Sequence, residues 1–133
     1  MLNVMKNLLI EWKHFDKEGN TCKRCSDTGV SIQTAVDELK EELKKKEIEI
    51  LFEETKLSEN GIKESNSILF NGIPIEELLD DTKAVETQCN SCCELIGSSV
   101  NCRALDCHGQ ITEEISVELI KSAVNNLLRR GTQ

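Results

Sequence analysis

Hydrophobic residues in the first half of the chain change their spacing twice. Residues 4–12 contain the short, continuous apolar run Leu8-Leu9-Ile10, which is typical of a buried strand. Apolar residues at helical spacing then predict a helix over residues 31–46, and alternation of apolar with polar residues predicts a strand over residues 47–54. A strand, a helix and a strand in immediate succession predict a right-handed parallel β-α-β unit.

The second half of the chain predicts two hairpins and a terminal helix. Asn71-Gly72 separates two apolar runs and favours a hairpin turn, because both positions tolerate positive φ. Pro74 cannot donate a ladder hydrogen bond, so it places the second strand of this hairpin at a sheet edge. A smaller hairpin is expected across His108-Gly109, and helical spacing over residues 117–129 predicts the final helix.

Size and charge narrow the class of protein. A chain of 133 residues predicts one domain, residues 1–133, whose core is mostly Leu, Ile and Val because only 3% of the residues are aromatic. The net charge of −8 argues against binding to nucleic acid or to an anionic membrane. Neither a signal-peptide pattern nor a membrane-spanning run is present, so we expect a cytoplasmic protein.

The seven cysteines form two groups. Cys22 and Cys25 make a C-x-x-C pair after the predicted first strand. The second group consists of Cys89, Cys92, Cys93, Cys102 and Cys107. Structural disulfides are rare in a reducing cytoplasm, and an odd number of cysteines does not suit a fully paired framework. These cysteines are therefore predicted to be catalytic or metal-binding.

Several segments give the chain a resemblance to known proteins. The order β-α-β, β-hairpin and terminal helix, with C-x-x-C between the first strand and the first helix, resembles the plan of the thioredoxin superfamily. More narrowly, the chain resembles an uncharacterised prokaryotic family of thioredoxin-like proteins, domain of unknown function 2703. The segments that carry this resemblance are Thr21-Cys22-Lys23-Arg24-Cys25, Glu64-Ser65-Asn66-Ser67-Ile68, Phe70-Asn71-Gly72-Ile73-Pro74-Ile75-Glu76, Cys89-Asn90-Ser91-Cys92-Cys93 and Cys102-Arg103.

The resemblance implies a thioredoxin-like α/β fold: β-α-β, a β-hairpin and a C-terminal helix. An irregular, cysteine-rich insertion at about residues 87–107 interrupts it. Thioredoxins carry a cis-proline just before the third strand, and Asn66 occupies that position here. This difference affects the part of the fold that binds substrate in conventional thioredoxins.

The first cysteine pair favours thiol–disulfide exchange. In the thioredoxin plan, C-x-x-C lies at the N-terminus of a helix, where unpaired N–H groups stabilise a thiolate. Lys23 and Arg24 lie between the two cysteines and add positive charge. We therefore expect Cys22 to be the nucleophile and Cys25 to resolve the mixed disulfide. The alternative for this pair is two ligands of a zinc site.

The second cysteine group favours a soft metal ion. If residues 87–94 are helical, Cys89, Cys92 and Cys93 share one face of the helix. With Cys102 as a fourth donor, they would suit Zn²⁺ or a thiophilic ion such as Cu(I), Hg(II) or As(III). Cys107 and His108 are reserve ligands. Both a structural zinc site and a functional role remain open for this group.

The other polar residues suggest no catalytic group. His14 follows the predicted first strand and is expected at the surface, and His108 is expected in a turn. Glu76-Glu77 and Asp80-Asp81 are expected on an acidic helix face, and Arg103 is expected at the surface.

Two functions from different classes follow. The leading one is a disulfide oxidoreductase that needs no cofactor, acts on a protein or small-molecule disulfide and is recycled by a separate reductant. The topology also brings the insertion toward Cys22, which permits a relay between the two cysteine groups. The alternative is binding of zinc or another thiophilic metal or metalloid, for structure or for sequestration.

Overall fold

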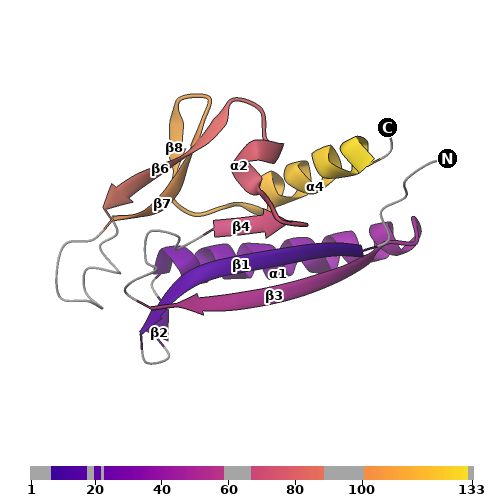
Figure 1. The fold of residues 1–133 in the computed structure, drawn as a ribbon, viewed down its shortest axis with the longest axis horizontal. Helices are drawn as coiled ribbons and strands as arrows, with labels where there is room; N and C mark the ends of the chain where they lie inside the picture. Colours follow the sequence, from indigo (N-terminus) through magenta and orange to yellow (C-terminus); the bar gives the residue numbers. More distant parts are fainter. Residues whose placement is uncertain (1–6, 18–19, 22, 59–66, 89–100, 132–133) are drawn as a thin grey trace.

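The long strand β1 organises the larger of two sheets (Figure 1). The computed structural model describes residues 7–17, 20–21, 23–58, 67–88 and 101–131. The elements in chain order are β1 (Asn7–Lys17), β2 (Asn20–Thr21), α1 (Lys23–Lys44), β3 (Glu49–Leu57), β4 (Ser67–Phe70), β5 (Ile73–Pro74), α2 (Ile75–Leu78), β6 (Thr82–Gln88), β7 (Asn101–Cys107), β8 (Gln110–Thr112) and α4 (Val117–Gly131). The chain is thus a mixed α/β protein, as its sequence predicts.

The larger sheet has the strand order β3-β1-β4-β5, and the short β2 pairs antiparallel with the end of β1. β1 pairs with β3 in parallel and with β4 antiparallel. The predicted β-α-β unit is therefore present, with α1 as its connection. β5 pairs only with β4 among the described strands, which confirms the predicted edge position of Pro74.

Both ends of this unit differ from the prediction. β1 continues to Lys17, beyond residue 12, and α1 begins at Lys23, well before residue 31. The first turns of α1 contain Ser, Asp, Thr and Gly, which are poor helix formers. Burial of Cys25 and Thr28 against the sheet stabilises these turns, which the sequence pattern could not indicate.

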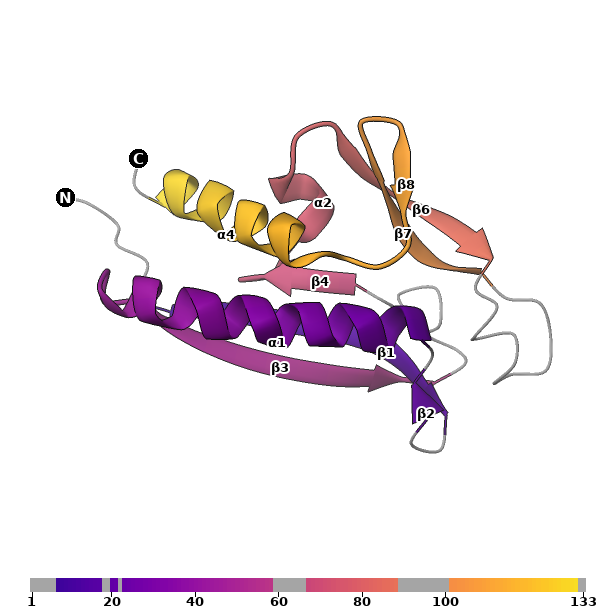
Figure 2. The ribbon, with the colours of Figure 1, turned by 180° about the vertical axis from the view of Figure 1, so that it is seen from behind.

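The core lies between one face of this sheet and two helices. Leu8, Ile10 and Trp12 alternate along β1 and are buried, and they belong to one apolar cluster with residues of α1 and α4. Figure 2 shows α1 and α4 on this face of the sheet.

Lys121 of α4 donates a hydrogen bond of 2.5 Å to Glu38 of α1, and this contact raises the pKa of Lys121.

The Asn71-Gly72 turn is held by its own asparagine. Its φ values of 52° and 83° confirm the predicted positive-φ hairpin turn. The Asn71 side chain also accepts a hydrogen bond of 2.8 Å from the N–H of Leu9, and the Asn71 N–H donates to the carbonyl of Leu9. This turn therefore extends the contact between β4 and β1.

The second sheet, β6-β7-β8, corrects the start of the predicted irregular segment, because Thr87 and Gln88 belong to β6. β6 and β7 form an antiparallel ladder from Thr82–Cys107 to Gln88–Asn101. β6 is Thr-Lys-Ala-Val-Glu-Thr-Gln, which has too few apolar residues to give a clear strand pattern. The predicted hairpin across His108-Gly109 is confirmed, and φ is positive at both residues.

Two further expectations are corrected nearby. α2 ends at Leu78, so Asp80-Asp81 lie in a turn after the helix and do not continue an acidic helix face. Arg103 is half-buried and donates a hydrogen bond of 2.6 Å to Glu76 of α2, so it is not a simple surface residue. This ion pair links the second sheet to α2.

None of the described helices is both long and apolar enough to cross a bilayer.

Substitution of Gly29 tests the close approach between α1 and β1. A Cβ at Gly29 would lie 2.6 Å from Cη2 of Trp12, whose ring is buried. Gly29→Ala should lower the free energy of unfolding by about 1 kcal/mol, because crowding of about 1–3 kcal/mol exceeds the gain in helix propensity. Urea unfolding followed by Trp12 fluorescence measures this change.

The matched control for this substitution is Val30→Ala. Val30 is 66% exposed on the same helix, so this variant should change the free energy of unfolding by less than about 0.5 kcal/mol. A Gly29→Ala variant as stable as the wild type would contradict the contact.

Candidate functional site

The beginning of α1 positions the predicted resolving cysteine. Cys25 is the third residue of the helix, and its side chain is completely buried. The C-x-x-C motif thus overlaps the helix N-terminus directly, without the intervening residues that a helix beginning at residue 31 would require. Cys22 itself lies outside the described residues.

His14 occupies the sheet below this helix, and the expectation of a surface histidine is wrong. Its side chain is only 1% exposed, because β1 continues its buried alternation from Leu8 through Trp12 to His14. The imidazole stacks on the Trp12 indole, with ring centroids 4.0 Å apart and 25° between the ring planes. The sequence would have indicated this buried position only if the first strand had been predicted to continue as far as His14.

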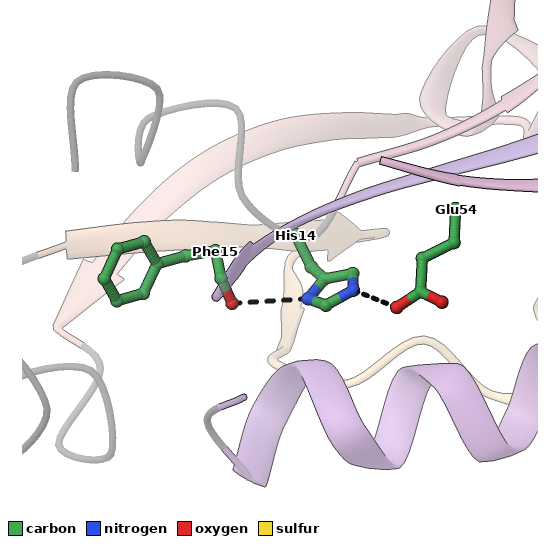
Figure 3. Close-up of polar contacts among 3 residues, drawn as sticks. All are labelled: His14, Phe15 and Glu54. Carbon is green, nitrogen blue, oxygen red and sulfur yellow. Dashed lines mark hydrogen bonds and ion pairs between the residues drawn. The ribbon is translucent and has the colours of Figure 1, made fainter. Parts of the chain in front are cut away.

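Two oxygen atoms hold the His14 ring (Figure 3). Nε2 lies 2.5 Å from Oε2 of Glu54 on β3, and Nδ1 lies 3.2 Å from the carbonyl oxygen of Phe15. The carbonyl can only accept, so Nδ1 must carry a hydrogen. Nε2 is then the nitrogen that faces the Glu54 carboxylate, so both ring nitrogens have a polar partner.

The packing of α1 on β1 relates the position of Cys25 to that of His14. Trp12 lies against Gly29, and the helix of a β-α-β unit runs opposite to its strands. His14 is two residues further along β1, about 6.6 Å. Cys25 is four residues back along α1, about 6 Å in the same direction. We infer that the His14 ring and the Cys25 thiol occupy neighbouring positions in the interface between helix and sheet.

The second cysteine group is described only in part. Cys89, Cys92 and Cys93 lie outside the described residues, as does Asn66. The helical interpretation of residues 87–94 is wrong at its start, since Thr87 and Gln88 belong to β6. Within the described residues, no three side chains of the metal-binding types converge.

Cys102 and Cys107 lie at opposite ends of β7. The backbone of Cys102 is opposite Thr87, one pair before the end of the ladder with β6. Cys107 is a free, half-buried thiol opposite Thr82, and it lines an open hollow of about 350 Å³ between the second sheet and α4. His108 is exposed, and its Nδ1 lies 3.2 Å from Oδ2 of Asp81. Cys102 and Cys107 therefore do not belong to one site.

The two views relate the second sheet to the start of α1. The end of β6 and the start of β7 lie at the same end of the molecule as the start of α1 (Figures 1 and 2). β5 runs antiparallel to β4 and therefore runs in the same direction as β1. The expected approach of the two cysteine groups at one edge of the sheet depends on this strand direction.

Substitution of Glu54 tests whether its carboxylate stabilises the buried imidazole of His14. Glu54→Ala leaves Nε2 of His14 buried without its acceptor, which should lower the free energy of unfolding by about 1–3 kcal/mol. Glu53→Ala is the matched control, because Glu53 is exposed on the other face of β3 and should change stability by less than about 0.5 kcal/mol. Equal effects of the two substitutions, measured by urea unfolding, would contradict the pair.

Comparisons with known proteins identify the family. The family described as Domain of unknown function (DUF2703) matches residues 8–124. An uncharacterized protein of Archaeoglobus fulgidus is 34% identical over 117 residues, which cover 85% of this chain and 82% of that protein. No solved structure matches the chain. The extent of the family match and the similarity to the archaeal protein show that the chain belongs to the DUF2703 family.

Proposed function

We propose that this protein is a thioredoxin-like thiol–disulfide oxidoreductase, in which Cys22 attacks and Cys25 resolves. The observation that carries the proposal is the completely buried side chain of Cys25 in the first turn of α1. A helix N-terminus stabilises the thiolate of a cysteine that precedes it, and Cys22 occupies that position in the sequence. A reducing compartment such as the cytoplasm suits this chemistry.

The topology supports the thioredoxin-like interpretation. A central β1 has β3 parallel on one side and β4 antiparallel on the other, followed by β5 and a terminal helix. This order matches the plan that the sequence resembles. In this interpretation the insertion comprises β6, β7 and β8, so it spans residues 82–112 and is larger than the predicted range of 87–107.

The proposed reaction has two exchange steps. The Cys22 thiolate attacks one sulfur of a substrate disulfide, forms a mixed disulfide and releases the first substrate thiolate. The Cys25 thiolate then attacks Sγ of Cys22 and releases the second substrate thiolate. The substrate gains two electrons, and the protein is left with a Cys22–Cys25 disulfide. A thiol reductant from outside the protein must return those two electrons.

The buried pair of His14 and Glu54 addresses a difficulty in the second step. Cys25 must lose a proton before it can attack, but its side chain is completely buried and has no direct contact with water. His14 occupies a neighbouring position, and Glu54 is partly exposed. We propose that His14 and Glu54 share one proton, that Glu54 releases this proton to solvent, and that Nε2 of His14 then takes the Cys25 proton.

Serine substitutions test the two cysteine roles. Cys22→Ser should abolish the reduction of a disulfide substrate, because no nucleophile remains for the first step. Cys25→Ser should accumulate a stable mixed disulfide on Cys22, which intact-protein mass spectrometry detects as a mass addition. Full activity of Cys22→Ser would contradict the assignment. A Cys25→Ser protein that never retains substrate would contradict the role of Cys25.

His14→Gln tests the proton acceptor separately. It should slow release of the mixed disulfide by about a hundredfold, because a general base contributes about that factor or more. The rate of the first step should remain within about twofold, since His14 serves only Cys25. Rapid-quench mass spectrometry separates the two steps. Equal slowing of both steps would indicate a structural effect on α1 and would remove His14 from the mechanism.

The register of the second sheet favours a second candidate, binding of a thiophilic ion. The ladder of β6 and β7 carries Cys102 in its second-last pair, next to the segment 89–100 that contains Cys89, Cys92 and Cys93. Four thiolates would suit zinc, or a metalloid such as As(III) in a three-sulfur site. Metal analysis of anaerobically purified protein tests this. Zinc kept by Cys22→Ser and lost by Cys92→Ser would support it, and metal-free wild-type protein would argue against a resident zinc.

A further inference from the structure

The edge strand β3 presents an unusual surface. All nine of its residues pair with β1, and no other described strand pairs with its second edge. Leu51 is 44% exposed and Phe52 is 36% exposed, on opposite faces of the strand. The only other large hydrophobic side chains that are exposed in the described part of the chain are Val30 and Ile111.

A long edge strand with exposed apolar side chains normally carries protection against pairing with another chain. Proteins use proline, lysine, a bulge or a covering segment for this purpose. β3 contains no proline, and its register with β1 is continuous from Asn7–Glu49 to Phe15–Leu57, without a bulge. Its charged side chains are Glu49, Glu53, Glu54 and Lys56, so they leave Ile50, Leu51 and Phe52 as an uncharged run. The centre of the strand therefore offers a regular ladder of backbone donors and acceptors.

We propose that β3 pairs antiparallel with β3 of a second copy of this chain, about a twofold axis at Phe52. The larger sheets of the two copies then form one continuous sheet. The pairing uses no cysteine and shares only Glu54 with the proposed reaction, so it stands even if the thiol chemistry is wrong.

Symmetry restricts the registers that such a pair can adopt. Residues directly opposite each other in an antiparallel pair point to the same face, so a twofold axis must place one residue opposite its own copy. With nine residues in β3, a ladder of at least seven residues is possible only with Phe52, Glu53 or Glu54 at the axis.

Charge selects among these three registers. An axis at Glu53 or at Glu54 places a carboxylate directly opposite its own copy, which is destabilising. An axis at Phe52 places Phe52 opposite Phe52 and Leu51 opposite Glu53. In the same register Ile50 lies opposite Glu54, whose carboxylate already contacts His14, and Glu49 lies opposite Thr55. Only the Phe52 register avoids opposing like charges.

The oligomeric state under reducing conditions tests the proposal. Sedimentation equilibrium with excess reductant should give twice the chain mass of 14.9 kDa, with a concentration-dependent return to monomer. Phe52→Lys should be monomeric, because it places two ammonium groups opposite each other. Val30→Lys is the matched control, since Val30 is exposed on α1, away from this edge, and should remain dimeric.

Leu51→Lys tests the register itself. In the Phe52 register the new lysine faces Glu53 of the other copy. The Leu51→Lys dimer should therefore persist, with a lower dissociation constant than the wild-type dimer. An axis at Glu53 or at Glu54 would instead place the lysine opposite Thr55 or Leu57, and the dimer would gain no stability. Circular dichroism and Trp12 fluorescence check that each variant is folded.

Hydrogen exchange provides a second measurement on the same proteins. Alternate amides of β3 that point away from β1 should be protected in the wild type and exchange rapidly in Phe52→Lys. A wild type that stays monomeric at every concentration, or a Phe52→Lys variant that stays dimeric, would overturn the proposal. Dissociation caused equally by Val30→Lys or by Ile111→Lys would place the interface elsewhere and would also overturn it.

Discussion

The close packing of α1 on β1 at Gly29 and Trp12 is the constraint on which the site depends. The absence of a side chain at Gly29 lets the indole ring of Trp12 lie directly against the helix. This contact fixes both the height of α1 above the sheet and its position along β1. The buried position of Cys25 one turn earlier, and that of His14 two residues later in β1, follow from it.

The interface between helix and sheet is therefore apolar along most of its length and polar at one end. His14 satisfies its ring nitrogens with Glu54 and the Phe15 carbonyl, and Thr28 accepts a hydrogen bond of 3.1 Å from the N–H of Ile115. A buried polar group without a partner would destabilise the fold, so these bonds make the polar end tolerable. Thr28 lies about one turn from Cys25 along α1, so this polar end includes the part of the helix that carries Cys25.

The second sheet is attached to this frame through a few specific contacts. The Arg103–Glu76 ion pair links β7 to α2, and the Ile115–Thr28 hydrogen bond links the chain entering α4 to the first turns of α1. The first contact joins the second sheet to α2, and the second joins the segment after β8 to α1. The second sheet is thus connected, through the segment after β8, to α1, the helix that carries Cys25.

The sequence by itself determined the β-α-β unit, the Asn71-Gly72 and His108-Gly109 turns and the terminal helix, because each has a strong local pattern. It also singled out Cys22 and Cys25, since a C-x-x-C motif is visible without any structure. Only the tertiary structure decided the long β1, the early start of α1, the strand β6 and the burial of His14. The physical reason is that these features depend on contacts between distant residues, such as Trp12 with Gly29 and His14 with Glu54. Such contacts stabilise segments whose own residues favour no particular element.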